Sequence, residues 1–194
     1  LWVGGTYGIV MLSVRGTIVT EGRLFEEDQR DLENTVRCFY SDHNGTVYAG
    51  SIYGLHTMGG NSRFISPCTS HGRALRDHGF RDAVNAVYDE DDGTLLLCGP
   101  GIQRYLPGEH HARQLLHGDD RRLGYWCLMR ESVDRLWAGT RTWGIVVYDR
   151  SFMKVSRMFH DPDQPGSLSN NSIHAMLRDR RGRIWIGTNG GLNR

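Results

Sequence analysis

A short apolar strand that ends in a glycine turn, followed by a second glycine and an aliphatic residue, recurs five times along this chain. The five copies are Leu1–Gly4 with Gly8 and Ile9, Val47–Gly50 with Gly54 and Leu55, Leu96–Gly99 with Gly101 and Ile102, Leu136–Gly139 with Gly144 and Ile145, and Ile184–Gly187 with Gly191 and Leu192. Their first glycines are 40 to 49 residues apart. A period of this length, built from strands and turns, is typical of one blade of a β-propeller.

The repeat extends upstream of the first glycine. Four mostly apolar segments read as buried strands and precede the motif, namely Val36–Tyr40, Val84–Tyr88, Tyr125–Met129 and Ile173–Leu177. A polar turn follows each one, and Gly45, Gly93 and Gly182 lie where a tight hairpin requires positive φ. Asp134 occupies the same place in the fourth copy, and aspartate is one of the few other residues that tolerate this conformation.

The residues after each second glycine predict the outer half of a blade. For example, Val146–Tyr148 and Lys154–Phe159 flank a polar turn. The sequence therefore predicts an all-β fold, a β-propeller arc of four-stranded antiparallel blades. The expected blades are three complete ones at about 36–65, 84–116 and 125–159, the last three strands of another at 1–20, and the first two strands of a fifth at 173–194. Because propeller units bury their faces against neighbours, we expect the segment alone to self-associate.

Composition excludes several classes of function. The 194 residues carry a formal net charge of +1, which provides no electrostatic footprint for nucleic acid. The chain has no apolar run of the ~18 residues that a membrane helix needs, and its start does not resemble a signal peptide. Cys38, Cys98 and Cys127 occupy positions held by alanine in other copies, so they are predicted to be small buried residues, whereas Cys68 is predicted to be exposed.

No constellation of residues predicts catalysis or metal binding. Ser151 and Lys154 match a Ser-x-x-Lys motif but lie in an outer hairpin without the required helix. The acidic segment 89–93 falls on a hairpin turn and lacks the alternating ligands of a calcium loop. Of the nine histidines, His174 lies on an inner strand and the others, His56 among them, are assigned to turns and linkers. The sequence therefore predicts no catalytic residue, no metal and no cofactor.

Blade geometry predicts where a ligand would bind. The loop between the second and third strands of a blade emerges on the same face as the connection to the next blade. These loops carry the candidate ligand-binding residues Tyr7, Tyr53, Arg141, Trp143 and Asn189. Aromatic rings stack on sugars, and arginine and asparagine bond hydroxyls or carboxylates. The alternative is that the three aromatic rings wedge between blades as packing residues.

The segment 161–173, followed by Ile184–Thr188 and Gly190–Arg194, closely resembles the two-component regulator propeller repeat. The segment 84–105 departs from that pattern, with Leu97 in the place of the tryptophan. The resemblance implies seven-bladed propellers, usually in tandem, in the periplasmic part of bacterial sensor histidine kinases. It also implies an oligosaccharide ligand, a homodimeric receptor and contacts with a second propeller.

Two other functions remain open at this point. A propeller lyase of the streptogramin-inactivating kind resembles these repeats but needs a histidine and acidic pair with metal. A propeller scaffold that binds proteins is the other alternative, because one fold hosts unrelated functions. The expected function is a non-catalytic sensing module.

Overall fold

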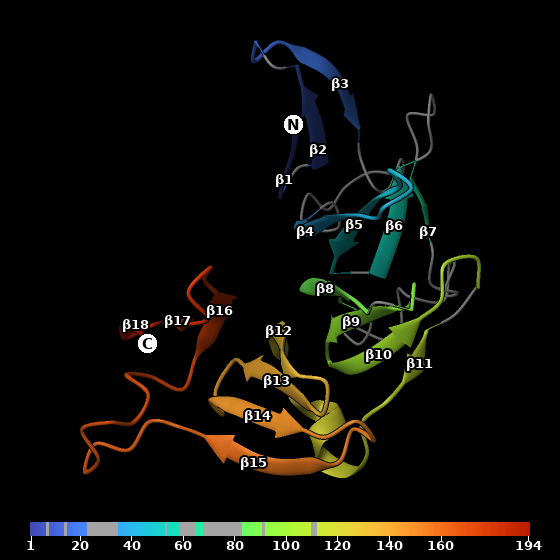
Figure 1. The fold of residues 1–194 in the computed structure, drawn as a ribbon. Helices are drawn as coiled ribbons and strands as arrows, with labels where there is room; N and C mark the ends of the chain where they lie inside the picture. The colour runs from blue at the N-terminus through green and yellow to red at the C-terminus, as the bar shows by residue number, and fades with distance from the viewer. Residues whose placement is uncertain are drawn as a thin grey trace. The chain divides into compact units, whose positions relative to one another are not determined.

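The computed structural model describes residues 1–6, 8–13, 15–22, 35–52, 54–58, 65–67, 83–90, 92–109 and 112–194. Within these residues the strands form five separate sheets, three of four strands and two of three strands (Figure 1). In every sheet the strands lie side by side in sequence order, as in the blades of a propeller. The predicted all-β fold of four-stranded antiparallel blades is confirmed.

The first sheet contains β1 (Trp2–Gly5), β2 (Gly8–Leu12) and β3 (Ile18–Gly22). The second contains β4 (Val36–Ser41), β5 (Val47–Ser51), β6 (Gly54–Met58) and β7 (Ile65–Pro67), and the third contains β8 (Ala86–Asp89), β9 (Leu95–Gly99), β10 (Gly101–Tyr105) and β11 (Arg113–Gln114). After the short 3-10 helix η4 (Gly118–Arg122), the fourth sheet contains β12 (Tyr125–Ser132), β13 (Arg135–Thr140), β14 (Ile145–Tyr148) and β15 (Lys154–Met158). The fifth contains β16 (Ile173–Arg178), β17 (Ile184–Thr188) and β18 (Gly191–Asn193).

The fifth sheet corrects one sequence expectation. Two strands were expected after residue 173, but β18 adds a third, with Gly191 opposite Thr188 and Asn193 opposite Ile186. The Thr188 side chain stabilises the turn between them, because its hydroxyl donates to the carbonyl of Gly191 over 3.0 Å. The turn therefore continues directly into a paired strand.

The hairpins between first and second strands share one turn geometry. In the second sheet Oδ1 of Asp42 accepts hydrogen bonds from the backbone N–H groups of Asn44 and Thr46, at 2.9 and 2.8 Å. Asp179 does the same in the fifth sheet. Gly45 and Gly182 adopt φ of +81° and +78°, which fulfils the prediction for these positions.

The fourth sheet differs at this turn. Asp134 does not adopt positive φ, contrary to expectation, because β12 continues through an irregular register after Arg130 and ends in a two-residue turn. In the described residues the non-glycine residue with positive φ is Phe152, at +57°, in the hairpin that joins β14 and β15. Oδ1 of Asp149 fixes that hairpin by accepting from the N–H groups of Ser151 and Met153.

The chain divides into two compact units. Unit 1 comprises residues 1–97 and 104–113. Its largest cluster of buried residues contains Tyr48, Leu55, Val84, Leu95, Leu97 and Tyr105. Within it, the glycine of each second strand makes room for the β-branched residue that leads into the next blade: a methyl group on Gly4 would lie 2.6 Å from Cγ1 of Val36, and one on Gly50 would lie 2.9 Å from Cγ1 of Val84.

Unit 2 comprises residues 98–103 and 114–194. Its core joins the fourth and fifth sheets through Ile145, Leu168, Ile173 and Ile186, with Trp137 and Met176 packed against them. The same packing of glycine against a β-branched residue recurs here between Gly139 and Ile173. At Gly4, Gly50 and Gly139 the motif therefore needs glycine, because the residue that leads into the next blade packs directly against it.

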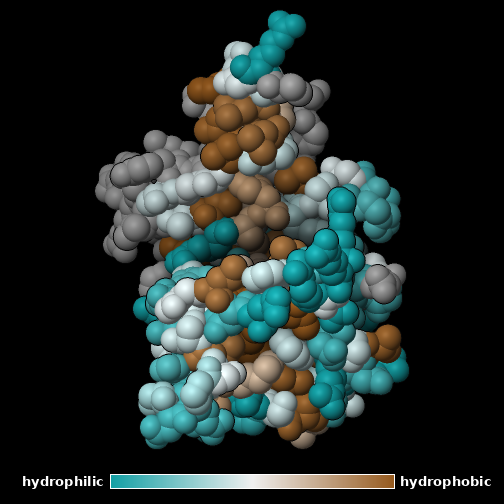
Figure 2. All heavy atoms as spheres, turned by 60° about the vertical axis from the view of Figure 1, so that its left-hand side comes forward, coloured by the Kyte–Doolittle hydropathy of each residue, from teal (hydrophilic) through white to brown (hydrophobic). Residues whose placement is uncertain are grey.

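Burial varies systematically across a blade. In the fourth sheet all four residues of β14 are buried, whereas four of the five residues of the outermost strand β15 are exposed. The innermost strand β12 is only partly buried, so the deepest positions belong to the middle strands. In the space-filling view of Figure 2, brown apolar side chains reach the surface between teal polar ones. Leu177 and Leu192 of the fifth sheet are exposed.

The predicted burial of the cysteines is confirmed for Cys98, whereas Cys38 and Cys127 are partly buried. Burial raises the pKa of Cys38 to about 11 and that of Cys127 to about 12. Cys68 lies outside the described residues.

His56 was assigned to a turn or linker, and this is wrong. It lies on β6, is 1% exposed, and its Nε2 is 2.9 Å from Oγ of Ser51. Burial lowers its pKa to about 4, so the imidazole is neutral at pH 7.

No helix in the described part of the chain has the length and apolar character needed to cross a bilayer.

Candidate functional site

The turns between second and third strands meet the segments that connect consecutive blades in unit 2. The backbone N–H of Gly101 donates to the carbonyl of Leu123 over 3.1 Å, and that of Gly144 donates to the carbonyl of Asn171 over 2.8 Å. Each acceptor lies two residues before the first residue of the next inner strand. These equivalent bonds bring the turns and connections of unit 2 to one face, which we call the connection face.

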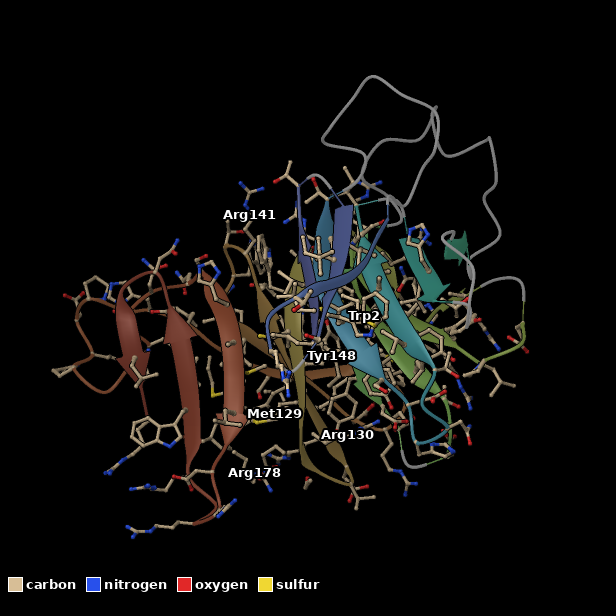
Figure 3. All side chains as sticks on the ribbon, turned by 90° about the horizontal axis from the view of Figure 1, so that it is seen from above. Trp2, Met129, Arg130, Arg141, Tyr148 and Arg178 are labelled. Carbon is tan, nitrogen blue, oxygen red and sulfur yellow. The ribbon has the colours of Figure 1, made fainter. Side chains whose placement is uncertain are left out.

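Arg141 and Asn189 occupy equivalent positions on the connection face. Each directly follows the threonine that ends a second strand. The N–H of Arg141 donates to the carbonyl of Gly124 over 3.0 Å, and that of Asn189 donates to the carbonyl of Ser172 over 3.2 Å. Figure 3 shows Arg141 at the opposite end of the strands from Arg178.

Tyr7 and Tyr53, the other two aromatic candidates, lie outside the described residues. The remaining candidates Arg141, Trp143 and Asn189 all belong to unit 2. Their backbones are therefore fixed by the same set of turns, but their side chains make different contacts.

The Trp143 turn is held by Thr140. Its hydroxyl donates to the carbonyl of Gly144 over 2.8 Å and accepts from the N–H of Trp143, also over 2.8 Å. Gly144 adopts φ of +76°, and a methyl group there would lie 2.2 Å from the carbonyl oxygen of Met158. The turn therefore requires glycine at this position, both for its conformation and for its space.

The Trp143 side chain lies against the outer strand. The guanidinium carbon of Arg157 is 5.0 Å from the centroid of the Trp143 ring and 4.4 Å from that of Phe159. Arg157 thus contacts two aromatic rings, an arrangement that cation–π attraction stabilises. Trp143 is still 45% exposed. We call these three residues the outer stack.

Asn189 belongs to a different group. The other two members of this group, Trp126 and His174, were not predicted from the sequence as site residues. Its Oδ1 is 2.6 Å from Nε2 of His174, and the His174 ring meets the Trp126 ring edge to face at a centroid distance of 5.6 Å. Trp126 comes from β12 and His174 from β16, the innermost strands of adjacent blades. We call Trp126, His174 and Asn189 the inner cluster.

An irregularity in the strand register positions both rings. The pairing of β12 with β13 shifts between Tyr125 and Cys127, and that of β16 with β17 shifts between Ile173 and Ala175. Trp126 and His174 are the residues at these bulges, and a bulge redirects the side chain that it carries. The repeat gave the available sequence signal for this position. The equivalent residues in two other blades are Arg37 and Asn85, so the residue at the bulge differs from blade to blade.

The segment between β15 and β16 supports the connection face with its own hydrogen bonds. The N–H of His160 donates to Oδ1 of Asn171 over 2.8 Å, and the N–H of Asp161 donates to Oγ of Ser167 over 3.0 Å. Leu168, which is 7% exposed, anchors the segment in the core of unit 2. The N–H of Ser169 donates to Oδ1 of Asn193, which ties the segment to β18.

The described residues contain no group of three or more histidine, cysteine or acidic side chains able to hold a metal ion. The Ser-x-x-Lys match has a structural explanation, because Nζ of Lys154 lies 3.4 Å from Oδ1 of Asp120. The acidic turn also has one, since Asp92 bonds the N–H of Thr94 and the side chain of Arg104. The described part of the connection face carries aromatic rings, an amide, an imidazole and a guanidinium.

Comparisons with known proteins agree with this fold. Residues 167–190 match the model of the family described as two component regulator propeller. Over 64 residues, 33% of the chain, the sequence is 35% identical to histidine kinase P4 of Formosa agariphila, and this region spans 5% of that protein.

Solved structures share the architecture at lower identity. The extracellular domain of BT4673 from B. thetaiotaomicron, a protein assigned to the hybrid two component systems, superposes with a TM-score of 0.78 at 19% identity, covering 98% of this chain and 25% of that one. The computationally designed protein Ika8 superposes with a TM-score of 0.57 at 13% identity, covering 96% of this chain and 52% of the designed one.

The chain spans about a quarter of the length of the BT4673 structure. The segment that matches the family model includes Leu168, Ile173 and Ile186 of the unit 2 core. The resemblance inferred from residues 161–194 is therefore confirmed: this chain carries a two component regulator propeller repeat within an all-β fold of successive blades.

Proposed function

We propose that this chain is part of the ligand-sensing ectodomain of a two-component sensor histidine kinase. The observation that carries the proposal is the regulator propeller repeat at residues 167–190, whose hydrogen-bonded turns build the connection face. The similarity to histidine kinase P4 and the fold shared with the BT4673 ectodomain support it. In this proposal the segment itself is not an enzyme and resides in the periplasm.

The proposed ligand is an oligosaccharide derived from a glycan. Arg141, Trp143 and Asn189 of unit 2, together with Tyr7 and Tyr53, are the proposed contacts. Exposed aromatic rings offer flat apolar surfaces to the C–H faces of sugars, and amide and guanidinium groups match hydroxyl and carboxylate oxygens. The rigid backbone of the turns supports this role, because a preorganised site loses little conformational entropy on binding.

Signalling would follow from a difference in affinity between states. A ligand shifts a conformational equilibrium only as far as it distinguishes the states. In the proposed receptor, a homodimer with a second propeller, an oligosaccharide would favour one arrangement of propellers and so change kinase activity across the membrane.

The proposal can be tested by isothermal titration calorimetry. The protein to use is the ectodomain encoded by the gene that contains these residues. Cellohexaose, xylohexaose and hexagalacturonate serve as probes of neutral and acidic glycans. Saturable heat with at least one of them is the expected result. Absence of heat with all three, from a protein with a cooperative thermal transition, would overturn the glycan assignment.

A further inference from the structure

The turn between β16 and β17 concentrates positive charge at one end of the fifth blade. Within six residues it carries four arginines, Arg178, Arg180, Arg181 and Arg183. Arg178 donates to the carbonyl of Glu131 in the fourth blade, and Nε of Arg183 donates to Oδ2 of Asp179 over 2.6 Å. Arg180 and Arg181 lie at the tip of the turn and are exposed. We call residues 178–183 the arginine hairpin.

The tip arginines are not needed by the turn that carries them. Asp179 fixes the turn by accepting from the backbone N–H groups of Arg181 and Arg183, and Gly182 provides the positive φ. One equivalent backbone bond closes this turn and those of the second and third blades. The matching tip residues in the sequence are His43 and Asn44 in the second blade, and Asp91 and Asp92 in the third. The charge of a tip is therefore free to serve binding.

The second and third blades form a pocket of opposite charge, which we call the acidic pocket. Its volume is about 250 Å³, and the aspartates Asp42, Asp89 and Asp92 line it together with the tip residues His43 and Asn44. Among the described residues that line it, none is a lysine or an arginine. The whole lining belongs to unit 1, whereas the arginine hairpin belongs to unit 2.

An arginine side chain fits the acidic pocket in size and in chemistry. The volume is below the ~300–1,000 Å³ of sites that hold drug-sized ligands, so it suits a single side chain better. Leu106 and Pro107 in the lining provide apolar contact for the aliphatic part of an arginine, and the carboxylates match its guanidinium. Asp92 already accepts such a group, because Oδ2 lies 3.3 Å from a guanidinium nitrogen of Arg104.

We propose that the arginine hairpin of one copy of this protein docks at the acidic pocket of a second copy, with the tip arginines among the carboxylates. A second copy is the occupant because the chain itself carries both complementary surfaces, and complementary charge fixes the register of an interface. Asp179 already orders the hairpin, so docking costs little conformational entropy. This inference rests on the homodimer in the proposed function and names residues of its contact.

Sedimentation velocity on the full ectodomain tests the contact by exchanging the charges. Arg180→Asp with Arg181→Asp gives the fifth blade the tip of the third, and His43→Arg with Asn44→Arg gives the second blade the tip of the fifth. Each double variant alone sets like charges against each other, so we expect its self-association to weaken at least about 10-fold. An equimolar mixture should associate to within about 3-fold of the unaltered protein, because each altered surface then meets its opposite.

Arg121 and Arg122 provide the matched control, since they are also consecutive exposed arginines of unit 2 but lie in η4. Arg121→Asp with Arg122→Asp should leave self-association within about 2-fold. A cooperative thermal transition in each variant would show that it is folded.

Three results would overturn the contact: an unaltered ectodomain that stays monomeric, self-association that survives both tip variants, or a mixture that stays dissociated. Calorimetry with cellohexaose, xylohexaose and hexagalacturonate separates these results from failure of the proposed function. Glycan binding that persists in the dissociated variants leaves glycan sensing intact, whereas absence of heat in the unaltered protein removes the glycan assignment and leaves the charge exchange to decide the contact.

Discussion

Ile173 packs directly against Gly139: a methyl group on Gly139 would lie 2.7 Å from Cγ2 of Ile173 and 2.6 Å from Sγ of Cys127. Ile173 begins the inner strand of the fifth blade, and Gly139 lies on the second strand of the fourth. The two blades of unit 2 can approach this closely only because the second strand has no side chain at that point.

Replacement of Gly139 by alanine should therefore destabilise the protein. The added methyl group must displace Ile173 or Cys127, and overpacking of this kind costs ~1–3 kcal/mol. Gly166 is the control, because it also belongs to unit 2 and is exposed, and a methyl group there would have no heavy atom within 4 Å apart from its chain neighbours. Chemical denaturation should show a loss for Gly139→Ala and a change within ~0.5 kcal/mol for Gly166→Ala. Equal losses in both variants would contradict this explanation.

Acid should destabilise the protein through His56. Burial lowers its pKa in the folded state to about 4, compared with 6.5 for an accessible histidine. The unfolded chain therefore takes up the proton first, so the stabilisation is complete above pH 6.5 and is lost as the pH falls toward 4. The shift corresponds to about 3 kcal/mol. His56→Gln should flatten this part of the curve of unfolding free energy against pH, whereas His43→Gln, at an exposed turn, should not.

Alkaline conditions should destabilise the protein through its cysteines. Burial raises the pKa of Cys38 from 9.0 to about 11 and that of Cys127 to about 12. Below pH 9 both states are protonated; above it the unfolded chain loses protons first, so stability falls as the pH rises through the folded-state values. Cys38 alone would account for about 2–3 kcal/mol at pH 11. Urea titrations of the Cys38→Ala variant should show a shallower alkaline decline, and an unchanged decline would argue against thiol burial as the cause.

Arg141 should select for acidic sugars if it lies beside the bound glycan. Its guanidinium can pair with a uronate carboxylate, an interaction worth about 1–2 kcal/mol when partly exposed. Arg141→Ala should therefore weaken hexagalacturonate binding by about 10-fold and cellohexaose binding much less. Arg135→Ala, at the opposite end of β13, is the control and should alter neither affinity. Loss of affinity for both sugars alike would indicate that Arg141 does not act through charge.

The sequence predicted the blades because glycine and apolar strands recur with a fixed period, and both have direct physical causes. Gly45 and Gly182 were assigned positive φ correctly, since the turn conformation excludes most other residues. Phe152 escaped this reasoning, because a turn held by the hydrogen bonds that Asp149 accepts places in this conformation a residue that rarely adopts it.

The inner cluster was missed for a different reason. Strand alternation places side chains on one face or the other, and a bulge breaks that alternation without any signal in the local sequence. His174 was placed on an inner strand, but its contacts with Trp126 and Asn189 depend on the packing of two blades. Burial of His56 was missed likewise, because a histidine beside a glycine turn resembles a surface residue until Ser51 is seen to bond it.

Asn171 and Ser172 are consecutive, yet their carbonyl groups receive hydrogen bonds from turns of two different blades, at Gly144 and Asn189. Two adjacent peptide units thus connect the neighbouring turns. A displacement of either turn is transmitted to the other over a few covalent bonds. A molecule bound to the turn of one blade would therefore also displace the turn of the next blade.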